Sequence, residues 1–238
     1  MIRKNRKNIE FRQLEIDKGY IKNADGSCLI KLGNTHIICT ASYENKVPRW
    51  LKGSGKGWVT AEYGMLPRST NERMRREATV GKVSGRTSEI QRLIGRALRS
   101  SIDLNILGEN LITIDCDVIQ ADGGTRTAAI TGGYIALSEC IKIMQVNKII
   151  NTKPIKNYVA AISCGYVKGD FLLDLEYEED STADVDANFV INSNQELIEI
   201  QLTSEKKACS EEEFNFMLAR AKKAIEKIID YQKIIISD

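Results

Sequence analysis

The feature that most constrains the fold is a half-buried strand that leads, through a glycine-rich turn, into a long apolar segment. Leu111 to Gln120 alternates apolar and polar residues, which is the pattern of a strand with one buried face. After the turn Ala-Asp-Gly-Gly-Thr-Arg, the stretch from Thr127 to about Met144 is rich in alanine, isoleucine and small residues. It predicts a buried helix, although it contains Gly132 and Gly133. We expect this strand, turn and helix to form the centre of the molecule.

The segments before this centre predict strands and a helix with an arginine-rich face. Ser27 to Leu32 and His36 to Tyr43 are rich in β-branched and apolar residues, and the Gly-Asn pair between them tolerates positive φ, so a hairpin is expected. Trp58 to Tyr63 is expected to be a further strand. From Glu89 to Ile102 apolar residues recur at helical spacing. The opposite face of that helix carries Arg92, Arg96 and Arg99.

The second half of the chain predicts antiparallel strands and a closing helix. The expected strands are Tyr158 to Val167, Phe171 to Tyr177, Val185 to Asn192 and Glu196 to Leu202. Ser210 and Glu213 have the spacing of a capping box, which marks the start of the final helix. The order of elements indicates an α+β fold. With few prolines and no flexible linker, we expect a single domain, residues 1–238, of two packed halves, about 1–145 and 146–238.

Composition indicates an intracellular protein that needs no covalent cross-links. At 238 residues the chain can bury a substantial core. The six cysteines are scattered, without a Cys-x-x-Cys pair, and are expected to be reduced core residues. The basic N-terminus is followed by no apolar stretch long enough for a signal peptide or a membrane span. We therefore expect a cytoplasmic protein that has no membrane partner.

The net charge of +2 conceals two blocks of opposite sign. Between Arg68 and Arg99 there are nine Lys or Arg residues against three Glu, whereas Asp170 to Asp186 contains eight carboxylates and no basic residue. The basic block predicts a polyanionic partner and the acidic block predicts a cation site. A solvated face is the competing interpretation of each block.

The turn after the central strand has the groups that a phosphate site needs. Gly123 and Gly124 allow backbone N–H groups to converge at the start of the following helix. Thr125 offers a hydroxyl and Arg126 a planar fork that matches phosphate. The spacing is neither that of a P-loop nor that of a dinucleotide-binding turn, so nucleoside triphosphates are not implied. A tight turn that happens to contain an arginine is the alternative.

Three further residues could complete such a site. Arg86 precedes the arginine-faced helix and is a second candidate phosphate ligand. Asp180 and Asp186 lie around a strand boundary, where two convergent carboxylates could hold Mg²⁺ or donate a proton. A solvated arginine and an acidic loop without metal are the corresponding alternatives.

The residues that the sequence lacks also restrict the mechanism. His36 is the one histidine, which excludes RNA cleavage by a pair of histidines, and it is expected to be a core or cross-strand residue. The sequence has no Gly-x-Ser-x-Gly elbow and no histidine-based zinc signature. Phosphoryl transfer needs mainly positioning and charge neutralisation, which arginines, backbone N–H groups and a divalent ion supply.

Four segments closely resemble the ribonuclease PH family. They are VPRWLKGSGKGWVTAEYGMLPRST from Val47, GKVSGRTSEIQRLIGRALR from Gly81, IDCDVIQADGGTRTAAITGG from Ile114 and LLDLEYEEDSTADVDANFVI from Leu172. The resemblance extends from about Arg12 to the final helix, in the same order. It implies two βαβ-type halves like the second domain of ribosomal protein S5.

The resemblance also implies a reaction. Inorganic phosphate would attack the terminal phosphodiester of tRNA precursors and other RNA 3′ ends, and nucleoside diphosphates would leave from 3′ to 5′, in a reversible reaction. By position, the residues expected to bind phosphate are Arg86, Gly124, Thr125 and Arg126. Asp180 and Asp186 match the family's acidic pair, in which one carboxylate would hold Mg²⁺ and one would act as general acid. The assignment between the two stays open.

A ring hexamer, a trimer of dimers, is the assembly that the resemblance implies. Arg68, Arg73 and Arg76 match arginines linked in the family to subunit contacts and tRNA docking. With Arg92, Arg96 and Arg99 they are the expected RNA-binding or interface residues. Leu202 and Ser204 depart from the family, which usually reads Gln-Gly-Thr-Ala-Glu where this chain has Gln-Leu-Thr-Ser-Glu, so a glycine is lost near the expected site. The N-terminal segment is also shorter and richer in lysine.

Three rival functions stand beside this one. A non-catalytic RNA-binding subunit of an exosome-like ring would not need the candidate site residues, so their presence argues against it. A metal-dependent hydrolytic nuclease would act without phosphate and release monophosphates. A purely structural assembly protein would need neither pocket.

Overall fold

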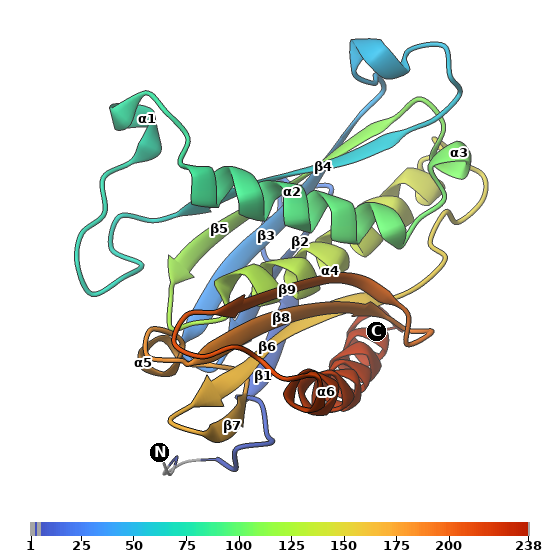
Figure 1. Cartoon of the computed structure of the whole chain (residues 1–238). Helices are drawn as coiled ribbons and strands as arrows, with labels where there is room; N and C mark the ends of the chain where they lie inside the picture. Colours follow the sequence, from blue (N-terminus) through green and yellow to red (C-terminus); the bar gives the residue numbers. More distant parts are fainter. Residues whose placement is uncertain (1–2, 4–5, 238) are drawn as a thin grey trace.

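A computed structural model describes residue 3 and residues 6–237. Their helices and two sheets form four layers (Figure 1). A five-stranded sheet is covered on one face by α2 (Gly85–Ser100) and α4 (Thr125–Val146). A four-stranded sheet follows, and α6 (Glu211–Ser237) covers its outer face. Since α4 lies between the two sheets, nearly every turn of this helix is buried, as its composition predicts.

The larger sheet belongs to the first half of the chain and has the strand order β1-β2-β3-β5-β4. Its strands are β1 (Leu14–Lys18), β2 (Gly26–Leu32), β3 (Thr35–Glu44), β4 (Trp58–Met65) and β5 (Leu111–Gln120). β4 and β5 are parallel and α2 lies between them in the chain, which makes a βαβ unit. The connections contain η1 (Arg49–Leu51), α1 (Glu77–Val80) and α3 (Leu104–Leu107).

The smaller sheet belongs to the second half and has the order β7-β6-β8-β9. Its strands are β6 (Val159–Val167), β7 (Asp170–Leu173), β8 (Val185–Asn192) and β9 (Leu197–Ser204), all antiparallel, with α5 (Tyr177–Asp180) between β7 and β8. The first half therefore contains the parallel βαβ connection, and the second half is an antiparallel sheet covered by a helix.

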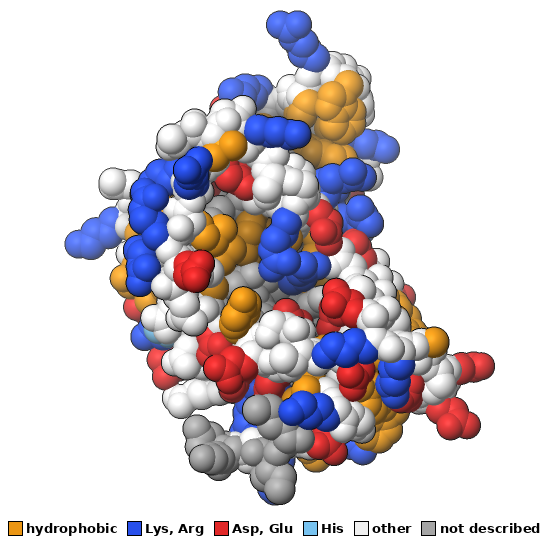
Figure 2. Space-filling view, turned by 60° about the vertical axis from the view of Figure 1, so that its left-hand side comes forward, with side chains coloured by type: hydrophobic (Ala, Val, Ile, Leu, Met, Phe, Trp, Pro, Cys, Tyr) orange, Lys and Arg blue, Asp and Glu red, His pale blue; other side chains and the backbone are white. Residues whose placement is uncertain are grey.

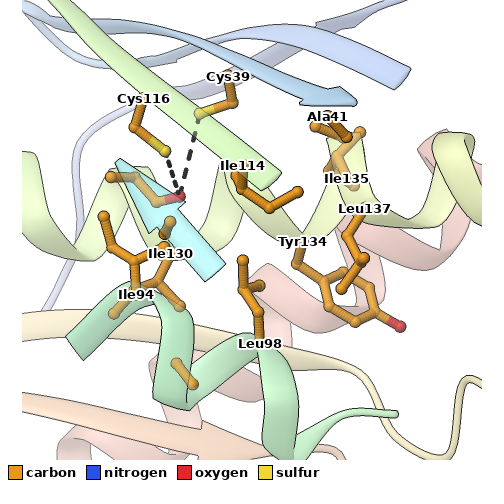
Figure 3. Packing of buried hydrophobic residues seen from close by; sticks show 14 of the residues in the cluster. Cys39, Ala41, Ile94, Leu98, Ile114, Cys116, Ile130, Tyr134, Ile135 and Leu137 are labelled. Atoms are coloured by element: carbon orange, nitrogen blue, oxygen red, sulfur yellow. Dashed lines mark hydrogen bonds between the residues drawn. The ribbon is translucent and has the colours of Figure 1, made fainter. Parts of the chain in front are cut away.

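The main core is formed where α2 and α4 meet the larger sheet. Figure 3 shows Leu98 of α2 and Tyr134 of α4 beside Ile114 of β5, all fully buried. The thiols of Cys39 and Cys116 donate weak hydrogen bonds to the carbonyl of Ala129 in α4, drawn as dashed lines in Figure 3. Core residues of β6 and β8 join the same cluster, so the two halves share one apolar interior.

Most of the expected elements are confirmed. The predicted hairpin is β2 and β3, with Gly33 at φ 56 in its two-residue connection. At the last helix, the Ser210 hydroxyl accepts from the Glu213 N–H at 3.2 Å, and the Glu213 carboxylate accepts from the Ser210 N–H at 3.0 Å, which is the expected capping box. The cysteines are free thiols, five buried and Cys209 partly buried.

One predicted strand, Phe171 to Tyr177, is wrong in its second part. β7 ends at Leu173, because the next residue, Asp174, has φ 55 and leaves the strand direction. The chain then turns into α5, which begins at Tyr177. Among the described residues, no helix has the length and apolar character needed to cross a membrane.

Candidate active site

The glycine-rich turn places the start of α4 at one end of the larger sheet. Gly123 and Gly124 have φ 73 and 64, a left-handed conformation that side chains rarely adopt. A Cβ on Gly123 would lie 2.3 Å from the carbonyl oxygen of Leu175, so the glycine also permits close approach of the acidic segment. Gly124 is the N-cap residue of α4, whose first N–H groups face out of the helix end.

Thr125, the first residue of α4, is held in place by a buried tyrosine. The Tyr63 hydroxyl of β4 donates to Thr125 Oγ1 at 2.8 Å. Burial raises the pKa of Tyr63, whereas the hydrogen bond to Thr125 and the positive charges of Arg86 and Arg126 lower it, so both charges act on this hydroxyl. The two arginines predicted from different segments therefore converge on the start of α4.

Arg126 is oriented by side chains from two other elements. Its Nη1 donates to Gln201 Oε1 of β9 at 2.6 Å and to Glu89 Oε1 of α2 at 3.2 Å. Gln201 Nε2 also donates to the Glu89 carboxylate, at 3.1 Å, and closes a triangle. The guanidinium thus lies where α2, α4 and β9 meet, with 18% of the side chain exposed.

Arg86 lies at the start of α2, which a separate set of contacts caps. The Ser84 hydroxyl accepts from the Thr87 N–H at 3.0 Å. The Glu77 carboxylate of α1 accepts from the Thr87 hydroxyl at 2.7 Å and from the Ser84 N–H at 3.1 Å. The Arg86 side chain itself is exposed and free to bind an anion at this helix start.

Asp180 and Asp186 face the same site from the second half. Partial desolvation raises the pKa of Asp180, although its side chain is still exposed at the surface of the single chain, while Arg126 and Arg86 lower it. Desolvation and the negative charge of Asp180 raise the pKa of Asp186, and Arg126 lowers it. Glu205 raises the pKa of both carboxyl groups. The structure therefore brings the predicted acidic pair together with the predicted phosphate ligands.

The carboxylate pair suits a magnesium ion better than a metal held by protein side chains alone. Among residue 3 and residues 6–237 there is no group of three or more His, Cys, Asp or Glu that could hold a metal. Mg²⁺ commonly keeps several waters and is held by one or two carboxylates together with substrate phosphates. Two carboxylates, of which the charge of Asp180 raises the pKa of Asp186, fit that donor set beside an anion site.

The six arginines expected to bind RNA or subunits fall into two groups. Arg68, Arg73 and Arg76 are exposed on the connection between β4 and α2, residues 67–84, which we call the basic segment. It extends from the body of the molecule in Figure 1. Figure 2 looks onto the side where α1 and α5 come forward: basic side chains gather over the upper part and acidic ones become frequent below.

The second group lies on α2 and is partly engaged within the chain. Arg96 pairs with Glu199 of β9 at 3.0 Å. Arg99 donates to the carbonyl of Val59 at 2.7 Å and lies 4.2 Å from the ring centroid of Trp58. Arg92 is exposed. Contacts of these three with RNA stay predictions, and Arg99 in addition has a structural role.

Two family models match most of the chain. Residues 10–141 match domain 1 of the 3′ exoribonuclease family, RNase PH, and residues 157–224 match domain 2. The chain belongs to the 3′ exoribonuclease family. Its relatives include the ribonuclease PH of Brucella ovis and that of Brucella canis, each 55% identical over 229 residues, 96% of either chain. The expected membership of the ribonuclease PH family is confirmed.

Solved structures, among them an archaeal exosome core, share the fold of this exoribonuclease chain. Rice Rrp46 has a TM-score of 0.78 at 19% identity, covering 98% of both chains. The archaeal exosome core has a TM-score of 0.76 at 18% identity, covering 96% of this chain and 89% of that one. At these identities the likeness establishes the fold, and the expected fold class is confirmed.

Sequence reasoning about the exoribonuclease site missed the residues that support it. Tyr63 and Gln201 stand inside the family-like motifs Ala-Glu-Tyr-Gly and Gln-Leu-Thr-Ser-Glu, which is the signal that could have found them. Leu202 has ordinary strand backbone and packs toward the core between α6 and the smaller sheet, on the side of β9 opposite Gln201. Because no positive φ is required there, loss of the family glycine leaves the Arg126 contact intact. His36 lies on β3 opposite Lys31, as the cross-strand expectation has it.

Proposed function

We propose that the protein is a phosphate-dependent 3′ to 5′ exoribonuclease that trims the 3′ ends of tRNA precursors and other RNAs. The observation that carries the proposal is the convergence of Arg86, Arg126 and the start of α4 on one side, and of Asp180 and Asp186 on the other. A basic, backbone-lined anion site beside a carboxylate pair suits an attack by inorganic phosphate on a phosphodiester.

The chemistry follows from these positions. An oxygen of the bound phosphate attacks the phosphorus of the terminal phosphodiester, the bond to the 3′ oxygen of the preceding nucleotide breaks, and a nucleoside 5′-diphosphate leaves. The departing 3′ oxygen takes a proton from the carboxylic acid of the pair, which regains it from solvent. Because phosphate is already anionic near neutral pH, no protein base is needed, which agrees with the single histidine, His36, lying on β3.

The side chains divide the work between binding and proton transfer. Arg86, Arg126, Thr125 and the N–H groups after Gly124 hold phosphate and the charge that develops on the transferred group. A raised pKa suits the carboxyl group that donates the proton. Asp180 and Asp186 would hold Mg²⁺, and the ion would neutralise negative charge on the reacting phosphoryl group.

Assembly and substrate choice form a second part of the proposal. Exposed Arg68, Arg73 and Arg76 support docking of tRNA and contacts between subunits in a homohexamer, a trimer of dimers. The archaeal exosome core, a multi-subunit assembly by its name, shares the fold and supports an oligomer. The cytoplasm, where tRNA precursors are processed, is the proposed location.

A non-catalytic subunit of an exosome-like ring is the second candidate, because the solved structures of similar fold include an archaeal exosome core. A subunit of that kind would have no use for a complete set of phosphate and carboxylate groups. The intact set in this chain favours the enzyme.

The product profile of a short 3′-extended RNA, with Mg²⁺ and with or without inorganic phosphate, tests the proposal. We expect nucleoside diphosphates, and only when phosphate is present. Monophosphates released without phosphate would identify a hydrolase, and intact RNA under both conditions would favour the non-catalytic subunit.

A further inference from the structure

A buried carboxylate that takes no part in the proposed chemistry joins the two sides of the site. The side chain of Asp174 is 0% exposed and that of Arg12 is 5% exposed. Asp174 Oδ2 accepts from the Arg12 backbone N–H and from Arg12 Nε, both at 2.8 Å, and Oδ1 accepts from Arg12 Nη2 at 2.7 Å. Burial by itself raises the pKa of Asp174, but the hydrogen bonds and charge of Arg12 outweigh it and lower the pKa, so this carboxylate stays ionised.

The other edge of the Arg12 guanidinium reaches the glycine-rich turn, residues 122–124, which we call the phosphate-binding turn after its proposed function. Its Nη1 donates to the carbonyl of Asp122, and Nη2 donates to that of Gly123 at 3.4 Å. A Cβ on Gly124 would lie 3.1 Å from Arg12 Nη2, so the guanidinium also packs against the N-cap of α4. One planar fork therefore binds Asp174 on one side and the backbone of the turn on the other.

Direct contacts between the turn and the acidic segment continue this connection. The Tyr177 N–H donates to Asp122 Oδ1 at 3.3 Å, and the chain at Leu175 and Glu176 closes over Gly123. On the opposite side, the Thr35 hydroxyl donates to the Gly123 carbonyl at 2.6 Å. The turn is thereby fixed between β3 and the start of α5.

The acidic segment is fixed at its other end as well. Arg3 donates from Nε and Nη2 to the Glu179 carboxylate, both at 2.6 Å. Arg6 joins the two ends, because it pairs with Glu179 at 3.6 Å and its Nη1 donates to Asp174 Oδ2 at 3.0 Å. Since Glu179 directly precedes Asp180, the position of the Asp180 carboxylate depends on Asp174 at one end of this segment and on Glu179 at the other.

We propose that Arg12 and Asp174 are positioning residues of the exoribonuclease, which set the place of the phosphate-binding turn relative to Asp180. The inference rests on the proposed function and deepens it. Neither side chain touches the reacting groups. They act through the backbone of residues 122–124 and through the segment 174–180, because reacting groups lose rate steeply when the geometry shifts by about 1 Å.

The variant Arg12→Lys separates positioning from folding. Lysine keeps a positive charge opposite Asp174 but has no fork, so it cannot bind Asp174 and the carbonyls of Asp122 and Gly123 together. We expect the KM for phosphate to rise about tenfold or more, with affinity for the RNA 3′ end unchanged. Phosphate should also protect this variant less against thermal unfolding, a binding readout that needs no turnover.

Asp174→Asn is the second variant, and Ile225→Ala is the matched control. Asp174→Asn removes the charge that orients Arg12 and should raise the KM for phosphate in the same direction. Ile225 is fully buried in the core between α6 and the smaller sheet, away from the turn, so its truncation lowers the melting temperature by a cavity alone. We expect a normal KM for phosphate in this control.

The outcomes distinguish the possible failures. A lower melting temperature with an unchanged KM for phosphate in Arg12→Lys would overturn the inference and leave a purely structural ion pair. An equal rise of this KM in Ile225→Ala would also overturn it, since any loss of stability would then suffice. Products formed by the unsubstituted chain without phosphate would instead refute the proposed function, and the inference with it.

Discussion

Two sets of arginines in this chain have opposite surroundings. Arg12 is buried, and its guanidinium is fixed to a carboxylate and to two backbone carbonyls. Arg68, Arg73 and Arg76 are exposed on the basic segment, which extends from the body (Figure 1). The groups of the proposed phosphate site are therefore held in place within one chain, whereas the surface proposed to bind a large RNA is exposed and open to other molecules.

The largest loss of activity should come from changes to the carboxylate pair, which lies with Arg12 in the part of the molecule that is held in place within the chain. Asp180→Ala and Asp186→Ala are each expected to lower turnover by about 10²–10⁴-fold, the usual range for loss of a proton donor. RNA affinity should be kept, because neither carboxylate attracts the RNA backbone. Single-turnover rates and binding of a labelled RNA measure the two separately. A parallel loss of RNA affinity and rate would show that the active site and the RNA-binding surface are not separate.

Arg126→Ala should reduce activity somewhat less, and through phosphate. We expect kcat/KM for phosphate to fall by about 10²–10³-fold, as for loss of a preorganised charge donor, with RNA binding largely kept. Arg126→Lys is the matched control: it restores the charge but not the fork held by Gln201 and Glu89, so recovery should be partial. Full recovery by lysine would show that charge alone matters at this position.

The basic segment should show the reverse behaviour. Replacing Arg68, Arg73 and Arg76 together by alanine is expected to weaken binding of a tRNA precursor by about tenfold and to flatten its salt dependence. The KM for phosphate on a short unstructured RNA should not change. The control replaces Lys153, Lys223 and Lys227, which are equally exposed elsewhere. Sedimentation of both variants reports whether the assembly has changed. A raised KM for phosphate in the triple arginine variant would show that the basic segment and the phosphate site do not act separately.

The smallest effect concerns stability. Because the folded-state pKa values of Asp180 and Asp186 are raised, ionisation of these groups opposes folding. The destabilisation is absent below the unfolded pKa of about 3.9 and complete above the folded pKa. Asp180→Asn and Asp186→Asn should therefore melt at higher temperature at pH 7, with the gain disappearing near pH 4. Glu226→Gln, at an exposed position of α6, is the control. A loss of stability at neutral pH would contradict the signs of both shifts.

Local sequence patterns predicted most helices and strands correctly, because alternation and capping depend on residues that are close together in the chain. The alternation from Leu111 to Gln120 gave β5 with its observed bounds, and Ser210 with Glu213 marked the start of α6. The error at Phe171 to Tyr177 has the opposite origin. Asp174 leaves the strand because Arg12, 162 residues away, binds its carboxylate, and no local signal announces such a partner.

The residues of the candidate site also fall into those that local motifs predict and those that only the fold brings together. Arg86, Arg126, Asp180 and Asp186 could be named from motifs, because they have characteristic neighbours in the chain. Tyr63, Glu89 and Gln201 were missed, since their value lies in contacts between β4, α2, α4 and β9 that only the fold creates.

The long separation between Arg12 and Asp174 has a consequence for synthesis. A ribosome releases the phosphate-binding turn well before it releases residue 174, and the partner of Arg12 is missing until then. The unfinished chain already displays the basic segment, and it emerges beside abundant RNA. It nonetheless lacks both the carboxylates and the contact that holds the turn, so a nascent chain cannot carry out the proposed reaction on that RNA. Activity begins only when the second sheet has closed on the first.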